Sequence, residues 1–236
     1  MTLQPEASDR LPRGPHGLTR EQVQASQRQR LLDAVLDVVG EHGYAAATVA
    51  DVTAAAGVSR TTFYEQFRNK LDAFLTAYDE FGKAFLADIA DTPATTPVET
   101  LTAAGGRLAE WGRTRPLACR AFLLEIHGVG EQGLEHRDRM MTLAVERFER
   151  VAAWVHSFDP TLPTPPPLVG RAIVAASWEL TSQAIRTPGD TTAESREALA
   201  YVWLLGLTGR PQLKTAEGSR NPARRGARDR RARRSG

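Results

Sequence analysis

The 236-residue chain has little cysteine and no long apolar run. Its single cysteine, Cys119, excludes an internal disulfide, and no stretch reaches the roughly 18 apolar residues that a membrane-spanning helix needs. An apolar leader is also missing from the N-terminus, which argues against export. We therefore expect a globular protein of the reducing cytosol without a membrane partner. A chain of this length builds one large domain or two modest ones.

Catalytic and metal-binding motifs are also missing. The sequence has no Gly-rich phosphate loop and no His-Glu metal spacing, and its five histidines are dispersed. Cys119 and His127 would make the best catalytic pair, but eight helical residues separate them by about 12 Å, beyond hydrogen-bond reach. We expect no enzyme activity, no cofactor and no metal. The apolar surroundings of Cys119 favour a small core residue over a redox sensor.

Positive charge is concentrated at the C-terminus. From residue 210 onward ten Lys or Arg accompany two acids, a balance of +8, whereas residues 1–209 carry a balance of −6. The segment "RNPARRGARDRRARRSG" has no apolar residue larger than alanine, so residues 210–236 are expected to form a disordered Arg-rich tail. The tail is either a tolerated, solubilising terminus or an electrostatic arm for nucleic acid phosphates. Residues 1–17, with their Pro and Gly, are expected to form a disordered N-terminal arm.

Helix signals start at Thr19, where Gln22 stands three residues later as in a capping box. An apolar stripe at helical spacing follows, and Gly43 marks the end of this first helix. Thr48 then precedes a helix of barely two turns, which Gly57 terminates as a left-handed turn residue. The apolar stripe of the first helix consists of Leu31, Ala34, Val35 and Val38.

The stretch "GVSRTTFYEQF", residues 57–67, predicts a short helix with two different sides. Ser59 is a good N-cap, and Val58, Phe63 and Phe67 share the side that faces the core. The opposite side presents Arg60, Thr61, Tyr64 and Gln66 to solvent, next to the free backbone donors of a helix N-terminus. A helix, a tight Gly turn and a short polar-fronted helix are typical of the helix-turn-helix, whose second helix enters the major groove.

Residues 28–80 closely resemble the DNA-binding domain of the tetracycline-repressor (TetR) family of bacterial transcriptional regulators. The likeness rests on the helix ending "GEHGY", the lead "TVADVTAAAGVS", the recognition helix "FYEQF" and the "NK" that opens the next helix, with Asn69 as cap and Asp72 at N3. The resemblance implies an all-α protein. It divides the chain into a DNA-binding domain of residues 18–80 and a helical effector-binding and dimerisation domain of residues 81–209.

The remaining residues independently favour helices, because no segment alternates with period two. Thr96, Pro97 and Glu99 form a cap, a helix-starting proline and a capping-box partner. Further helices fit "VETLTAAGGRLAEWGR", "PLACRAFLLEIHG" and "EHRDRMMTLAVERFERVAAWVHS". The last pair, "LVGRAIVAASWELTSQAIR" and "TAESREALAYVWLLGL", resembles the dimer-forming helices of the family, with a monomer core as the alternative.

Together these features predict a homodimeric, ligand-responsive transcriptional regulator, most simply a repressor. It would bind a palindromic operator in double-stranded DNA and be released by a small-molecule effector. A sequence-nonspecific architectural DNA binder that uses the Arg-rich tail is the alternative. The expected DNA contacts are Thr48, Gly57, Ser59, Arg60, Thr61, Thr62, Tyr64, Gln66 and Lys70, with Arg60 reading a base edge. The expected effector contacts are Phe85, Trp111, Phe122, Ile126, Met140 and Trp178.

Overall fold

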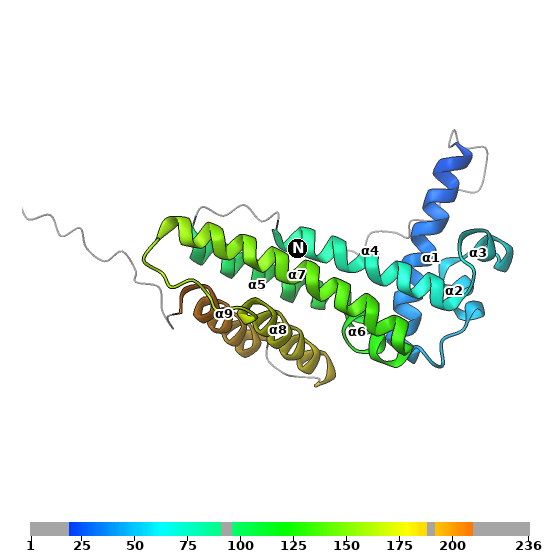
Figure 1. Ribbon diagram of the computed structural model, residues 1–236. Helices are drawn as coiled ribbons and strands as arrows, with labels where there is room; N and C mark the ends of the chain where they lie inside the picture. The colour runs from blue at the N-terminus through cyan, green and yellow to red at the C-terminus, as the bar shows by residue number, and fades with distance from the viewer. Residues whose placement is uncertain (1–18, 91–95, 188–191, 210–236) are drawn as a thin grey trace, which may run out of the picture. The chain divides into compact units, whose positions relative to one another are not determined.

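The computed structural model describes residues 19–90, 96–187 and 192–209 (Figure 1). Over these ranges the chain forms nine α-helices and one short 3-10 helix, which confirms the all-α prediction. The predicted arm of residues 1–17 and the Arg-rich tail of residues 210–236 lie outside the described residues. The helices are α1 (Arg20–His42), α2 (Val49–Ala56), α3 (Arg60–Gln66), α4 (Lys70–Ala90), α5 (Pro97–Thr114), α6 (Pro116–Leu123), η1 (Glu125–Val129), α7 (Glu131–Phe158), α8 (Val169–Arg186) and α9 (Thr192–Thr208).

Capping side chains determine where α1 and α5 begin. The Thr19 hydroxyl accepts the backbone N–H of Gln22 at 3.2 Å, while the Gln22 side chain accepts the Thr19 N–H at 2.8 Å. The backbone N–H of Thr96 likewise donates to the Glu99 carboxylate at 3.2 Å at the start of α5. Both predicted capping boxes are therefore present, each satisfying two backbone donors that a helix leaves unpaired at its N-terminus.

The described chain divides into two compact units. Of the described residues, 19–86 and 111–140 form unit 1, and 87–90, 96–110, 141–187 and 192–209 form unit 2. In unit 1, α2 and α3 lie beside α1 (Figure 1), and α6 packs closely on the end of α1, where the Leu117 backbone lies against Gly40. The predicted domain boundary at residue 80 stays a prediction; by contacts, residues 111–140 group with the helix-turn-helix.

The core of unit 1 is built from apolar side chains of α1, α2, α3 and α4. Phe63, Phe74 and Tyr78 are fully buried, and Tyr78 stacks on Phe122 with ring centroids 4.5 Å apart. The apolar side chains of α1 in this core include those of the predicted stripe. They are Leu31, Leu32, Ala34, Val35, Leu36, Val38 and Val39.

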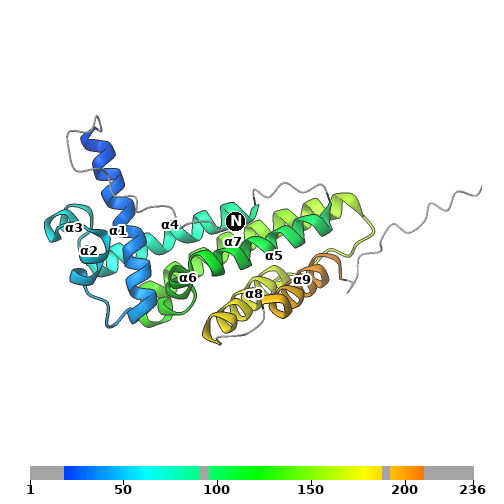
Figure 2. The same ribbon diagram turned by 180° about the vertical axis from the view of Figure 1, so that it is seen from behind.

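In unit 2, α8 and α9 lie side by side (Figure 2). A Cβ atom at Gly206 would lie only 1.6 Å from the Ile173 side chain, so glycine is what permits this close approach of the two helices. The Trp203 indole N–H donates to the Ser177 hydroxyl at 2.8 Å, which links the helices through a polar contact.

The segment "PLACRAFLLEIHG" is not one helix as its pattern predicts. α6 stops at Leu123, and Glu125–Val129 continue as the 3-10 helix η1, which ends before Gly130 at φ 88°. After this break, the Glu125 carboxylate accepts the backbone N–H of Tyr44 at 3.1 Å.

None of the helices in the described ranges combines the length and the hydropathy needed to cross a bilayer.

Candidate DNA-binding site

The turn between α2 and α3 has the geometry that the helix-turn-helix requires. Gly57 adopts the left-handed conformation at φ 64° and ψ 38°, and its N–H returns to the Ala54 carbonyl at 3.2 Å. The next N–H, that of Val58, donates to the Thr53 carbonyl at 3.1 Å. These bonds satisfy carbonyls at the end of α2, and a Cβ at residue 57 would be strained at this positive φ. Gly57 therefore serves the turn itself.

The short helix α3 is anchored by its aromatic residues. Phe63 is fully buried and Phe67 is 3% exposed, and their ring centroids lie 5.7 Å apart. The Ser59 hydroxyl caps the helix by accepting the Thr62 N–H at 3.0 Å. Two buried rings and a cap hold in place a helix of seven residues, which would be too short to persist alone.

The opposite face of α3 is polar and open to solvent. Arg60 and Thr61 are exposed in its first turn, and Tyr64 is 53% exposed one turn later. Gln66 and Thr62 are half-buried, and the Thr62 hydroxyl lies 3.0 Å from the Ser59 hydroxyl. Within the described part of the chain the Arg60 side chain has no hydrogen bond or ion pair. Its guanidinium is thus free to meet a ligand beside the N-terminus of α3.

Two other expected DNA contacts are engaged within the protein. The Thr48 hydroxyl donates to the Asp51 carboxylate at 2.6 Å and the Thr48 backbone N–H donates to it at 3.0 Å, and these two bonds lower the pKa of Asp51. The Lys70 ammonium donates to the carbonyls of Tyr44 and Ala47 at 2.6 and 2.7 Å. Burial lowers the pKa of Lys70. Two of its three ammonium protons are used, which leaves one for a phosphate.

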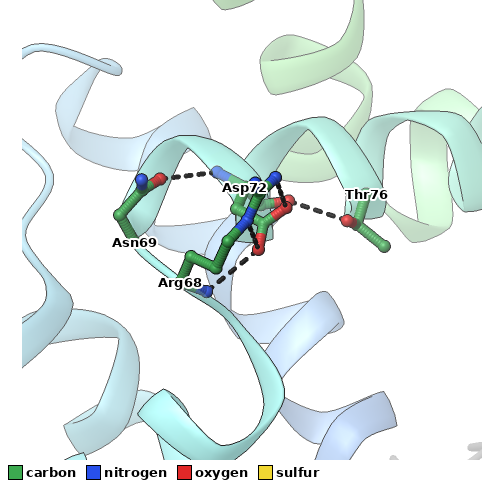
Figure 3. A network of polar contacts seen from close by, with 4 residues as sticks. All are labelled: Arg68, Asn69, Asp72 and Thr76. Carbon is green, nitrogen blue, oxygen red and sulfur yellow. Dashed lines mark hydrogen bonds and ion pairs between the residues drawn. The ribbon is translucent and has the colours of Figure 1, made fainter.

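The start of α4 carries a network of polar contacts (Figure 3). Asn69 caps the helix by accepting the Asp72 N–H at 2.9 Å. The Asp72 carboxylate accepts the Arg68 backbone N–H at 2.9 Å and pairs with its guanidinium at 3.2 Å, and the Arg68 bonds lower the pKa of Asp72. The Thr76 hydroxyl donates to the Asp72 carbonyl at 2.7 Å. This network fixes the first turn of α4, from which Lys70 projects.

Arg28 and Arg30 of α1 contribute to the DNA-binding domain in a way that the sequence pattern did not reveal. The Arg30 guanidinium donates to the Ala56 carbonyl at the end of α2 at 2.9 Å, and Arg28 lies 4.8 Å from the centroid of the Phe67 ring. A cation near helix C-terminal carbonyls is favoured by their partial negative charge. The two arginines occur two residues apart just before the apolar stripe of α1, which is the only sequence signal for them.

Five of the six expected effector contacts lie in unit 1. Trp111 meets the Phe85 ring edge-on at 5.4 Å, and Phe122 lies 6.4 Å from Phe85. A Cβ at Gly82 would lie 2.7 Å from Met140 and 2.8 Å from Phe122, so these side chains fill the space over α4. Ile126 is 1% exposed. The sixth residue, Trp178, belongs to unit 2 and is half-buried.

Cys119 is buried in α6, and burial raises the pKa of its thiol to about 11, with Arg115 opposing the shift. A protonated thiol is a poor nucleophile, so this environment supports the core role that the sequence favours.

A left-handed glycine turn joining two helices, with a capped second helix that exposes a polar face, defines the helix-turn-helix class of DNA-binding proteins. Comparison with known proteins finds a family model for this part of the chain. Residues 31–76 match the model for bacterial regulatory proteins of the tetR family. Residues 31–76 therefore carry a DNA-binding domain of the tetR type.

Solved structures with the same fold cover most of the chain. The fatty acid degradation regulator FadR of Bacillus halodurans is 22% identical with a TM-score of 0.61, over 77% of this chain and 98% of that one. FadR of Bacillus subtilis, solved in complex with stearoyl-CoA, is 17% identical with a TM-score of 0.63, over the same shares. A tetR-family regulatory protein of Rhodococcus RHA1 is 19% identical with a TM-score of 0.58, over 77% and 95%. No curated protein sequence matches the chain.

Proposed function

We propose that the protein is a homodimeric repressor that binds a palindromic operator in double-stranded DNA. A small molecule bound by its helical body releases it from the operator in the cytoplasm. The exposed face of α3 carries this proposal: Arg60 and Thr61 stand in the first turn of a helix whose other face is locked by Phe63 and Phe67. First-turn residues of a recognition helix are the ones that reach base edges.

Within this site the Arg60 side chain contacts a base edge, and the residues around it bind DNA phosphates. A guanidinium without an internal partner offers the two parallel donors that the O6 and N7 atoms of guanine accept. Thr48, Ser59, Thr62, Tyr64 and Lys70 take phosphates, and Gly57, Thr61 and Gln66 complete the contact surface. Lys70 combines two roles, because its two internal bonds aim the ammonium while the third proton stays available.

Dimerisation involves α8 and α9. Tyr201 is 51% exposed and Leu205 is 42% exposed on α9, and Ala172 and Ala175 are exposed on α8. An interface of this kind brings two copies of α3 to half-sites one DNA turn apart, which is how a helix-turn-helix gains affinity and reads a palindrome.

The effector binds among the aromatic side chains of α4, α5 and α6. Met140, an unbranched and adaptable side chain, covers Gly82 and is the one most easily displaced by a ligand. For release, the ligand must prefer the form of the dimer whose recognition helices do not match the operator, and DNA then weakens ligand binding by the same factor. α4 connects the two proposed sites, because it begins at Lys70 and includes Phe85 four turns later. A movement of α4 caused by the ligand would therefore reach the DNA-binding residues.

A genome-wide binding map followed by affinity measurements on the recovered operator tests this function. Arg60→Ala is expected to weaken operator binding by about 1–3 kcal/mol and to relax preference at one position in each half-site. Arg139→Ala on α7 removes an equal charge from another exposed site and is expected to leave preference unchanged. Unaltered base preference in Arg60→Ala would refute the assignment.

The effector is found by a thermal-shift screen, and stearoyl-CoA is included because the Bacillus subtilis structure contains it. Hits are titrated against the operator complex. Compounds that bind tightly and leave operator affinity unchanged would favour constitutive DNA binding over sensing.

The Arg-rich tail supports a second candidate, an architectural DNA binder. Its balance of +8 suits phosphate binding without sequence preference. This role predicts equal affinity for operator and random DNA, whereas a regulator prefers its operator about 10³-fold or more. Deleting residues 211–236 should flatten the salt dependence of nonspecific binding; an identical slope would show that the tail does not take part.

A further inference from the structure

The turn between α1 and α2, residues 43–48, is held by side chains from two distant parts of the sequence. On one side the backbone N–H of Tyr44 donates to Oε2 of Glu125 at 3.1 Å. On the other side the Tyr44 carbonyl accepts a bond from Lys70 Nζ at 2.6 Å, and the Ala47 carbonyl accepts a second at 2.7 Å. The turn thus connects the start of η1 with the start of α4.

The sequence at the end of α1 explains why an outside acceptor is needed. Gly43 ends the helix at φ 84°, and its own N–H returns to the Val39 carbonyl at 2.9 Å. The following N–H, that of Tyr44, points out of the helix and takes Glu125 instead. A Cβ at residue 43 would lie 3.3 Å from the Glu125 carboxylate, so glycine gives the carboxylate access to the turn.

Glu125 itself is held in place. Its second oxygen pairs with Arg120 on α6 at 3.7 Å, and its side chain is only 20% exposed. The Tyr44 ring packs against Phe74 with ring centroids 5.3 Å apart, and its centroid lies 4.3 Å from Lys70 Nζ. A shift of Tyr44 would therefore disturb its contacts with both of these α4 residues. The same turn leads directly into Thr48, the N-cap of α2.

We propose that Glu125 is a positioning residue for DNA binding: by accepting the Tyr44 N–H it fixes the turn that sets Thr48 and Lys70 for phosphate contact. The inference rests on the proposed function, in which those two residues take phosphates. It also links α6 and η1, within unit 1, to the DNA-binding residues, because these two elements carry Arg120 and Glu125. Neither Glu125 nor Arg120 touches DNA in this role.

The direction of the change in operator affinity distinguishes this positioning role from an effect of charge alone. Removing an acid raises the net positive charge and, by itself, strengthens binding to DNA phosphates. Positioning predicts the opposite for Glu125→Ala, about tenfold weaker operator binding and a salt slope smaller by about one phosphate contact. Glu125→Gln loses the same charge but keeps an oxygen for the Tyr44 N–H, so it is expected to bind the operator at least as well as the wild type.

Asp33→Asn is the matched control. Asp33 on α1 pairs with Arg115, the residue before α6, at 2.7 Å, an acid–arginine ion pair like that of Glu125 and Arg120 but one that does not touch the turn. It should keep the wild-type salt slope. Equal weakening in Asp33→Asn and Glu125→Ala would assign the effect to a general loosening of α6, and equal weakening in Glu125→Gln would assign it to the Arg120 ion pair. Each of these results, or unchanged binding in Glu125→Ala, overturns the proposal.

Amide hydrogen exchange on the wild-type protein tests the contact without DNA and without relying on a folded Glu125→Ala variant. The Tyr44 amide is expected to be protected, and Glu125→Gln to keep that protection. Rapid exchange of the Tyr44 amide in the wild type contradicts the proposal. A protected amide in a protein that recognises no operator would instead contradict the proposed function, so the two failures are distinguishable.

Discussion

Gly40 and Gly112 provide a matched pair for testing how α6 packs on α1. Both lie in unit 1, each two residues before the last residue of its helix. A Cβ added at Gly40 would lie 2.1 Å from the Leu117 carbonyl oxygen and 2.7 Å from its carbon, whereas a Cβ at Gly112 has nothing within 4 Å. Substitution by alanine should therefore lower the free energy of unfolding at Gly40 and raise it at Gly112.

The magnitudes follow from two competing effects. Alanine improves helix propensity over glycine by about 0.5–1 kcal/mol, and at Gly112 this gain is the whole effect. At Gly40 the Cβ overlaps a backbone oxygen by roughly 1 Å relative to an ordinary C···O contact of about 3.3 Å. Overpacking costs about 1–3 kcal/mol, and because backbone cannot rotate away, the upper part of that range applies. Gly40→Ala should lose about 1–2 kcal/mol net.

Chemical and thermal unfolding of both variants at one fixed protein concentration measures the difference. For a chain of this size 1 kcal/mol shifts the Tm by about 2–4 °C, so Gly40→Ala should lower Tm by several degrees while Gly112→Ala raises it slightly. Stabilisation of equal size in both variants would show that α6 does not approach Gly40 as closely as described, and the reasoning would fail.

Three further outcomes are expected. Cys119 should resist iodoacetamide at pH 8 in the folded protein and react on unfolding, because a thiol pKa raised to about 11 leaves about 100-fold fewer thiolates; fast native labelling contradicts this. Leu205→Glu should give monomers of unchanged helicity that lose operator affinity, whereas Leu134→Glu on α7, at a site 47% exposed against 42% for Leu205, should stay dimeric in sedimentation; a wild-type monomer at micromolar concentration contradicts the proposed dimer. Ser177→Ala should cost about 1–3 kcal/mol by leaving the Trp203 N–H without its acceptor, as measured by denaturant unfolding.

The features predicted correctly from the sequence are those whose partners lie a few residues apart. Thr19 with Gln22, Thr96 with Glu99 and the left-handed Gly57 turn are local, so residue type and spacing determine them. The buried side of α3 was also predictable, because the spacing of Phe63 and Phe67 leaves one face for the core.

Long-range polar contacts were not predictable in this way. The pattern of "PLACRAFLLEIHG" predicts one continuous helix, and nothing local indicates that Glu125 bonds to a backbone N–H 81 residues earlier. Lys70 likewise carried only a general expectation of phosphate binding, whereas the structure gives its ammonium two carbonyl partners. Such contacts depend on which helices pack together, and a helical pattern fixes the face that is buried but not its neighbour.

The free energy of allosteric coupling can be compared with the free energy of a single hydrogen bond in this protein. Allosteric coupling between two sites is typically about 1–3 kcal/mol, and a hydrogen bond to a charged group contributes about 1.5–3 kcal/mol. The single bond from Tyr44 to the Glu125 carboxylate therefore has the magnitude that effector release requires. Under the proposed function, an effector that displaces Met140 or Phe122 is expected to break that bond by shifting η1, because Ile126, the residue after Glu125, is buried in the same unit. In this proposed mechanism, release from the operator requires no unfolding of α3: the capped, aromatic-anchored helix is expected to stay intact while the proposed phosphate contacts are lost.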